Sequence, residues 1–309
     1  MIFLHKSKSL ILFLALSGVV FAVTVTVFDQ PFPGSGAAIA SVQEAASTIV
    51  ITQTAIASEQ PVAQQPVALP PKEVTTNAAI SLRTDENGQE VIFEKSVQVP
   101  LPIASLTKLM AALVVMEHYN LAQKITVSEA AMGQEGDQGE LKAGQIFSVK
   151  NLLYIMLMES SNRAAYALSD AMGNEEFVAL MNENAALLGL ANTSFDDSTG
   201  LSEKSYASAR DVALLSSHLF ENYPLFKEII GTKEFDVYLE DAILHHKAIT
   251  TNILFGVNRI IGGKTGYTDA ARGCLMIIQE NTAGGYTVHV VLGAEDRWGE
   301  MQKVLEIKN

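Results

Sequence analysis

The spacing of apolar and polar residues divides the chain from about residue 77 onward into strands and helices. Short runs rich in β-branched and apolar residues at 78–82 and 90–94 flank a polar segment with an Asn-Gly pair, which predicts a hairpin. Apolar residues then take up a helical period beginning at Ser105. The same period predicts further helices over residues 149–158, 162–172, 175–188 and 209–220.

The last part of the chain returns to strands. Residues 274–279 and 287–292 are almost continuously apolar, as in buried strands, and a helix is predicted over 298–305. A hairpin first, helices in the middle, strands late and a helix last predict an α/β (α+β) fold. We expect one antiparallel sheet that joins both ends of the domain and is flanked by helices.

The N-terminus carries a different pattern. Residues 9–28 contain no charge, and this run is about the 20 residues that a helix needs to cross a bilayer. His5, Lys6 and Lys8 precede it, which places the N-terminus inside and the remainder outside. We therefore expect residues 1–30 to form an uncleaved signal-anchor helix in the cell membrane. A cleaved signal peptide is the alternative, and it would make the domain a secreted one.

A spacer is predicted between this run and the domain. Six of the nine prolines lie between residues 31 and 71, among Ala, Gln, Ser and Thr. We interpret residues 31–74 as a semi-extended linker, and residues 75–309 as the globular domain.

Composition excludes several classes of function. The chain has 21 Lys and Arg against 34 Asp and Glu, a net charge of −13, which argues against nonspecific binding to nucleic acid. Cys274 is the single cysteine, so an intramolecular disulfide and a zinc site with two or more thiolates are both impossible. There is no His-Glu-x-x-His, and the adjacent His245 and His246 cannot act as i,i+4 ligands, so no metal is expected.

The first candidate motif is Ser105-Leu106-Thr107-Lys108. Residues three apart share one face of a helix, so this spacing puts the Lys108 amine beside the Ser105 hydroxyl. A serine needs a base before it becomes a nucleophile, and a lysine serves as that base only when its amine is neutral. A helix-capping serine with a solvated lysine is the structural alternative.

Two further motifs follow. Ser160-Ser161-Asn162 lies between two predicted helices, where it supplies either a helix cap or a proton relay with a hydrogen-bonding amide. Lys264-Thr265-Gly266 resembles part of a phosphate-binding loop, but Asn258 stands where that motif requires Gly. A strand edge with an ammonium, a hydroxyl and backbone N–H groups suits a carboxylate and an acyl carbonyl instead.

Together and in this order, the three motifs resemble those of the serine D-alanyl-D-alanine carboxypeptidases. These are the low-molecular-mass penicillin-binding proteins of peptidase family S11, a β-lactamase/transpeptidase-like fold with an all-helical subregion that carries the Ser-x-Asn motif. The likeness extends over roughly residues 76–306. It is carried by residues 104–110, 141–145, 152–154, 160–162, 188–195, 198–201, 263–271 and 290–294.

The resemblance implies a role for each matching residue. Ser105 would attack the carbonyl between two terminal D-alanines of a peptidoglycan stem peptide, Lys108 would be the general base, and Ser160 would relay a proton. Asn162 would orient the site. Lys264, Thr265, Gly266 and Tyr267 would bind substrate, with the backbone N–H groups of Ser105 and Tyr267 as the oxyanion hole. β-Lactams would acylate Ser105 as inhibitors, and no cofactor is implied.

Three alternatives stay open. A D,D-endopeptidase would cut cross-links with the same residues. A class A β-lactamase shares two of the motifs but needs a Glu to activate the deacylating water, and no segment of the sequence supplies it convincingly. A non-enzymatic wall-binding or penicillin-sensing module would keep the fold without the chemistry.

Overall fold

The computed structural model describes residues 9–16, 19–26 and 73–307, and the chain divides into two units, Met1–Gln64 and Gln65–Asn309. In the first unit, β1 (Ser9–Leu16) and β2 (Val19–Thr26) pair antiparallel, with Ser9 opposite Thr26. The remaining described residues belong to the second unit, which we call the catalytic domain after the role that the family resemblance implies.

The helix predicted over residues 9–28 is wrong for the residues that the structure describes, because two strands stand there. An uncharged apolar run satisfies the hydrophobicity requirement of a helix or a strand equally, and valine and threonine, which dominate β2, favour a strand. Over the ranges 9–16, 19–26 and 73–307, none of the helices is both long and apolar enough to cross a membrane. The predicted linker, 31–74, lies outside the described residues except for its last two.

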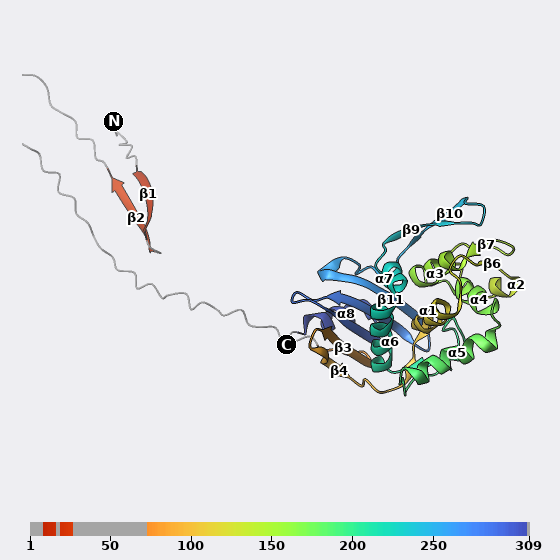
Figure 1. Ribbon diagram of the computed structural model, residues 1–309. Coiled ribbons are helices and arrows are strands. Elements are labelled where there is room, and N and C mark those ends of the chain that lie inside the picture. Colours follow the sequence, from red (N-terminus) through yellow and green to blue (C-terminus); the bar gives the residue numbers. More distant parts are fainter. Residues whose placement is uncertain (1–8, 17–18, 27–72, 308–309) are drawn as a thin grey trace, which may run out of the picture. The chain divides into compact units, whose positions relative to one another are not determined.

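A five-stranded antiparallel sheet forms one side of the catalytic domain (Figure 1). Its order is β11 (Ile260–Thr268), β12 (Arg272–Glu280), β13 (Tyr286–Ala294), β3 (Ala78–Asp85) and β4 (Gly88–Lys95). β3 and β4 confirm the predicted hairpin, and the pairing of β3 with β13 confirms that the sheet joins both ends of the domain.

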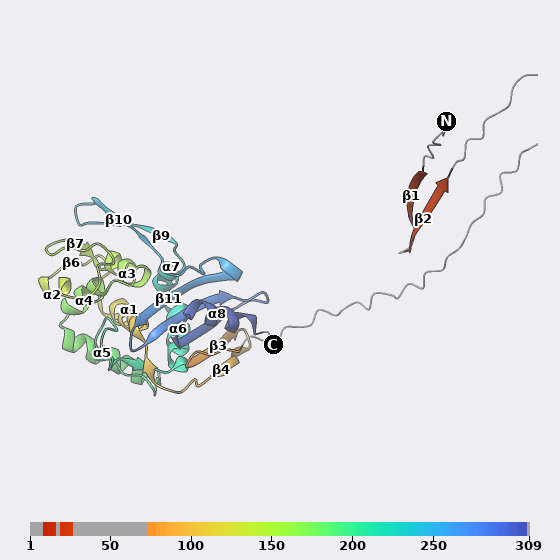
Figure 2. The ribbon, with the colours of Figure 1, turned by 180° about the vertical axis from the view of Figure 1, so that it is seen from behind.

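The helices lie where the apolar period placed them, with ends that differ by a few residues. A 3₁₀ turn (η1, Ala104–Leu106) precedes α1. The longer helices are α1 (Thr107–His118), α3 (Val149–Met158), α4 (Asn162–Asp170), α5 (Asn174–Leu187), α6 (Ala209–Asn222) and α8 (Arg297–Glu306). Seen from both sides, α1 to α5 form a helical region beside the sheet (Figures 1 and 2).

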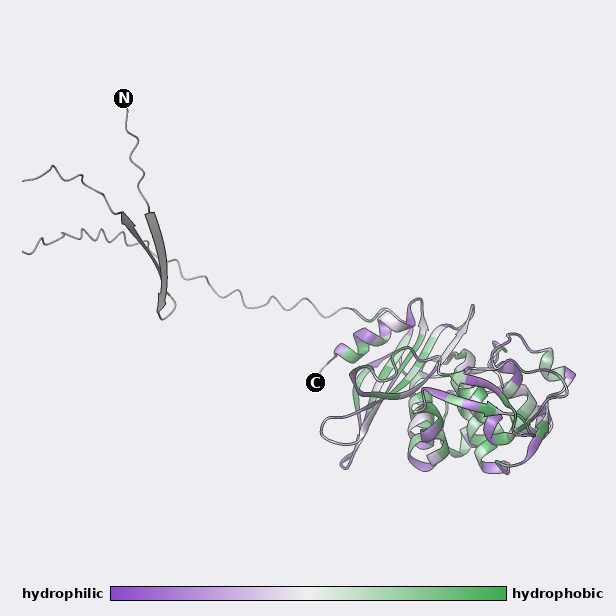
Figure 3. Cartoon of the chain, turned by 90° about the horizontal axis from the view of Figure 1, so that it is seen from above, coloured by the Kyte–Doolittle hydropathy of each residue, from purple (hydrophilic) through white to green (hydrophobic). Residues whose placement is uncertain are grey.

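Alternate residues of the central strands point into two separate cores. Ile80, Met276 and Val290 face the large core shared with α1, α3 and α6, whereas Leu275 and Val291 face a smaller core under α8. Figure 3 shows hydrophobic residues along the strands and the helices, and hydrophilic residues on loops and outer turns. Period-2 alternation with burial on both sides explains why these strands are almost continuously apolar in sequence.

Several short elements were not predicted, because each is too brief or too polar for a periodic signal. They are β5 (Leu101–Pro102), β6 (Lys124–Thr126), α2 (Glu129–Met132), β7 (Ile146–Ser148), β8 (Tyr206–Ala207), α7 (Pro224–Ile230), β9 (Glu234–Tyr238), β10 (Leu244–Ile249) and η2 (Val257–Arg259).

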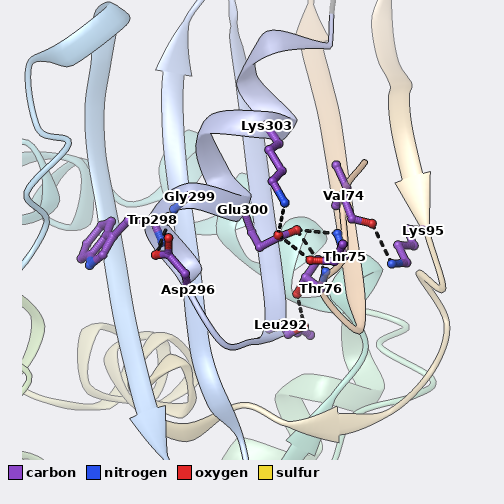
Figure 4. Close-up of polar contacts among 10 residues, drawn as sticks. All are labelled: Val74, Thr75, Thr76, Lys95, Leu292, Asp296, Trp298, Gly299, Glu300 and Lys303. Atoms are coloured by element: carbon purple, nitrogen blue, oxygen red, sulfur yellow. Dashed lines mark hydrogen bonds and ion pairs between the residues drawn. The ribbon is translucent and has the colours of Figure 1, made fainter. Parts of the chain in front are cut away.

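A buried carboxylate attaches the first residues of the domain to α8 (Figure 4). Glu300 accepts hydrogen bonds from the backbone N–H groups of Thr75 and Thr76, at 2.7 and 3.0 Å, and from the Thr75 hydroxyl at 2.7 Å. The Lys303 ammonium contacts the same carboxylate at 2.5 Å. We call Thr75, Thr76, Glu300 and Lys303 the Glu300 cluster. It joins segments more than 220 positions apart in the chain.

Candidate active site

Ser105 lies in the η1 turn directly before α1. Neither η1 nor α1 has a side-chain cap, so Ser105 does not serve as one. One turn later on the same face, Lys108 is completely buried, and its Nζ lies 3.0 Å from the Ser105 Oγ. The structural alternative of a capping serine and a solvated lysine is therefore wrong.

The other partners of Lys108 fix the direction of its lone pair. Nζ also lies 2.6 Å from the Asn162 Oδ1 and 2.6 Å from the Thr199 backbone oxygen. Asn162 donates its Nδ2 to the Glu135 carbonyl at 2.8 Å, which orients Oδ1 toward the lysine. Both oxygens accept hydrogen bonds only, so a neutral amine uses its two N–H groups on them and directs its lone pair at the Ser105 hydroxyl.

Burial favours this neutral form. It lowers the pKa of Lys108 from its usual value of 10.5 to about 7, while the negative charge of Asp197 raises it. A substantial fraction of Lys108 is thus unprotonated near neutral pH, as a general base requires.

Ser160 and Asn162 approach the same place from the junction of α3 and α4. Ser161, not Ser160, caps α4 by accepting a hydrogen bond from the Ala164 N–H at 3.2 Å. Ser160 has a φ of +65°, and its hydroxyl accepts from the Lys264 ammonium at 2.7 Å. The cap and the relay candidate are thus adjacent serines with different tasks.

The third motif lies on β11. Lys264 is buried and also donates to the Thr265 carbonyl at 2.9 Å. Burial first, then the charges of Lys108 and Arg297, hold its pKa well below the ordinary range. The Thr265 hydroxyl pairs with that of Thr251 at 2.8 Å.

Gly266 allows β11 to approach the serine closely. A Cβ at this position would lie 3.0 Å from the Ile103 carbonyl and 3.1 Å from the Ser105 backbone nitrogen. The absence of a side chain therefore brings the strand edge beside the hydroxyl. Tyr267, the next residue, is 62% exposed and stands at the rim.

These residues share one cleft of about 460 Å³. Six of the eight predicted site residues line it: Ser105, Ser160, Asn162, Thr265, Gly266 and Tyr267. Lys108 and Lys264 lie buried beneath, in contact with Ser105 and Ser160. The structure thus brings together all eight residues that the family resemblance named.

Other residues of the site lack a local motif. The Thr199 backbone carbonyl contacts Lys108, and Arg297 donates its Nη1 to the Gly266 carbonyl at 2.8 Å. Glu135, Glu159 and Asp269 add carboxylates to the cleft, and Glu159 pairs with His246 at 2.7 Å. A backbone carbonyl leaves no signal in a sequence, and acidic residues are common on any surface.

No three His, Cys, Asp or Glu side chains within the described part of the chain are grouped so that they could hold a metal ion.

Comparison with known proteins decides the family. The family model described as D-alanyl-D-alanine carboxypeptidase, peptidase S11, matches residues 62–296. The chain belongs to the peptidase S11 family. Its fold is shared with solved structures: it superposes on a D-alanyl-D-alanine carboxypeptidase from Mycobacterium tuberculosis with a TM-score of 0.70 at 23% identity, covering 78% of this chain and 93% of that one. A Streptomyces DD-transpeptidase variant gives the same score at 25% identity, covering 76% and 98%.

The curated relatives of this chain carry two kinds of name. The D-alanyl-D-alanine carboxypeptidase DacF of Bacillus subtilis is 31% identical over 246 residues, 76% of this chain and 62% of DacF. A D-alanyl-D-alanine endopeptidase of Pseudomonas aeruginosa is 31% identical over 239 residues, 72% of this chain and 73% of that protein. The chain thus covers less than two thirds of the length of DacF and more than two thirds of the length of the endopeptidase.

Proposed function

We propose that this S11 protein is a serine-type D-Ala-D-Ala carboxypeptidase, which removes the terminal D-alanine from peptidoglycan stem peptides through an acyl-enzyme on Ser105. The observation that carries the proposal is the hydrogen-bonding of Lys108. Its two N–H groups have acceptors in Asn162 and Thr199, so its lone pair is left for the Ser105 proton.

The chemistry then follows in two halves. Lys108 takes the Ser105 proton while Oγ forms a bond to the carbonyl carbon between the two D-alanines. The C–N bond breaks as the proton held by Lys108 reaches the leaving amine through Ser160, so D-alanine departs and Lys108 is neutral again. Lys108 then takes a proton from the water that attacks the ester and returns it to the Ser105 Oγ as the ester C–O bond breaks, which releases the shortened peptide. Lys264 supports Ser160 in this relay through its 2.7 Å hydrogen bond.

The edge of β11 suits the substrate's terminal carboxylate. The buried Lys264 amine and the Thr265 hydroxyl supply hydrogen-bond donors beside the cleft, and a bound carboxylate would favour the protonated form of Lys264. Gly266 and Tyr267 continue the edge past Ser105, where the backbone N–H groups of Ser105 and Tyr267 would hold the oxyanion. The same site would accept β-lactams as acylating inhibitors.

The test is acylation of Ser105. Mass spectrometry after incubation with a labelled penicillin should locate a long-lived adduct on this residue, and Ser105→Ala should abolish both the adduct and the release of D-alanine from a pentapeptide. Rapid turnover of penicillin would favour a β-lactamase instead, and unchanged D-alanine release by Ser105→Ala would exclude the proposal.

A D,D-endopeptidase is the second candidate, supported by the name of the Pseudomonas aeruginosa relative. Digestion of purified muropeptides separates the two activities. Release of D-alanine without loss of cross-linked dimers supports the carboxypeptidase, and loss of dimers supports the endopeptidase.

We also propose that the catalytic domain acts on the extracytoplasmic side of the cell membrane, where peptidoglycan lies. The uncharged run at residues 9–28 with its basic flank supports export. Cell fractionation with protease treatment of intact protoplasts tests this. Degradation of the domain, or its recovery in the medium, is expected, whereas a protected cytoplasmic domain would contradict the proposal.

A further inference from the structure

One carboxylate organises the loop whose Thr199 carbonyl contacts Lys108. Asp197 accepts hydrogen bonds on Oδ2 from the backbone N–H groups of Gly200, Leu201 and Ser202, at 3.0, 3.0 and 3.4 Å. The Thr199 hydroxyl donates to the same oxygen, and the Ser205 hydroxyl donates to Oδ1 at 2.8 Å. Five donors thus converge on one side chain.

The loop held in this way touches both ends of the Ser-x-x-Lys motif. The Thr199 carbonyl accepts from the Lys108 Nζ at 2.6 Å. Gly200, with a φ of +82°, packs so closely on the residue before Ser105 that a Cβ would lie 2.0 Å from the Ala104 carbonyl oxygen. A shift of this loop would therefore move an acceptor of the base and the backbone that carries the nucleophile.

We infer that Asp197 is a positioning residue of this enzyme: it fixes the Thr199 carbonyl against Lys108 and places a negative charge beside the base. The inference rests on the proposed function, since it assigns Lys108 that role. Asp197 touches no reacting atom, and it acts only through the loop and through its charge.

The charge of Asp197 affects the Lys108 pKa together with the other charged groups near this amine. The nearby basic groups are Lys264 on β11, whose own pKa is lowered by burial, and Arg297, while Glu135, Glu159 and Asp269 line the cleft. Asp197 is the charged group that opposes the effect of burial on the Lys108 pKa. Without it, the neutral amine would be favoured further, so the base would lose its proton at lower pH.

Asp197→Asn separates the effect of the Asp197 charge from the effect of its hydrogen bonds to the loop. An asparagine can keep the connectivity, since its carbonyl accepts from the backbone N–H groups and its amide donates to the Ser205 hydroxyl. The matched control is Asp196→Asn, which removes the same charge from the adjacent, exposed position. For each protein, the rate of acylation by a fluorescent penicillin and kcat/KM for D-alanine release are measured from pH 5 to 9.

We expect the acidic limb of both profiles to move about 0.5–1 pH unit lower in Asp197→Asn and to stay in place in Asp196→Asn. An unmoved limb, or one moved to higher pH, overturns the inference even if the rate falls at every pH. A defect in the loop alone would lower the rate without moving the limb.

Thr199→Val tests the positioning separately, and it does so even if Asp197→Asn fails to fold. It removes one donor to Asp197 while keeping the carboxylate and the Thr199 backbone carbonyl. We expect acylation to slow several-fold without a shift of the acidic limb to lower pH, and a wild-type rate would contradict the inference. Ser105→Ala tells the two hypotheses apart: if it is inactive while the Asp197 variant behaves as wild type, the proposed function stands and this inference fails.

Discussion

Glu300 and Lys108 are buried ionisable side chains at which distant segments of the catalytic domain meet, but their surroundings act on the charge in opposite directions. Glu300 receives two backbone N–H groups, a hydroxyl and an ammonium. Burial alone would raise its pKa, yet the donors from Lys303, Thr75 and Thr76 lower it to about 2. The Glu300 cluster therefore stabilises a charge.

Lys108 has only neutral acceptors in direct contact: an amide oxygen, a backbone carbonyl and a hydroxyl. Its charge is poorly compensated, and burial lowers its pKa to about 7. Burial of an ionisable side chain therefore has two different consequences within this domain. The charge of Glu300 is fully compensated by its donors, which contributes to stability. The charge of Lys108 is incompletely compensated, which produces a reactive amine.

The largest expected effect is on catalysis. Lys108→Met keeps the length of the side chain but removes the lone pair, so acylation of Ser105 by penicillin should slow by about 10²–10⁴-fold. Stopped-flow measurement of adduct formation checks this. Lys204→Met, at an exposed position, serves as the control. A rate within tenfold of wild type would remove Lys108 from its assigned role.

Next in size is the loss of the Glu300 cluster. Glu300→Ala leaves a buried N–H group, a part-buried N–H group and the Lys303 ammonium without their acceptor, and it should lower the free energy of unfolding by about 2–4 kcal/mol. Urea denaturation measures the change, while the acylation rate of the folded protein should stay the same. Glu295→Ala, which breaks an exposed pair with Arg272, should cost less than about 1 kcal/mol. Equal losses in the two variants would mean that the Glu300 cluster stabilises the domain no more than the exposed ion pair does.

The pH dependence of acylation gives a smaller but sharper test. Because the reactive form of Lys108 is neutral and its pKa lies at about 7, the rate should rise with pH through 7 and fall about tenfold per unit below it. A profile of second-order acylation rates from pH 5 to 9 measures this limb. A flat profile would show that another group controls the proton of Ser105.

The smallest effect is expected at Lys303. Its side chain is 23% exposed, and the Thr75 and Thr76 donors to Glu300 remain when it is removed. Lys303→Met should therefore cost only about 0.5–1.5 kcal/mol in urea denaturation. A loss as large as that of Glu300→Ala would mean that the ion pair with Lys303, and not the backbone N–H groups, provides most of the stabilisation by the Glu300 cluster.

The sequence alone determined the hairpin of β3 and β4, the long helices and the buried strands β12 and β13. Periodicity reports which face of an element is buried, and these elements are long enough to show it. The family resemblance named eight residues that meet at one cleft, and of their contacts only the one between Ser105 and Lys108 follows from local spacing, since residues three apart share a helix face.

Tertiary structure decided the rest. The apolar run at residues 9–28 satisfied helix and strand alike, and the described strands β1 and β2 could not be told from a helix by hydrophobicity. The Thr199 carbonyl at Lys108 and the contact of Arg297 with Gly266 join positions 91 and 31 residues apart, without any local pattern. The proton affinity of Lys108 was likewise beyond the sequence, because desolvation depends on what the folded chain packs around the amine.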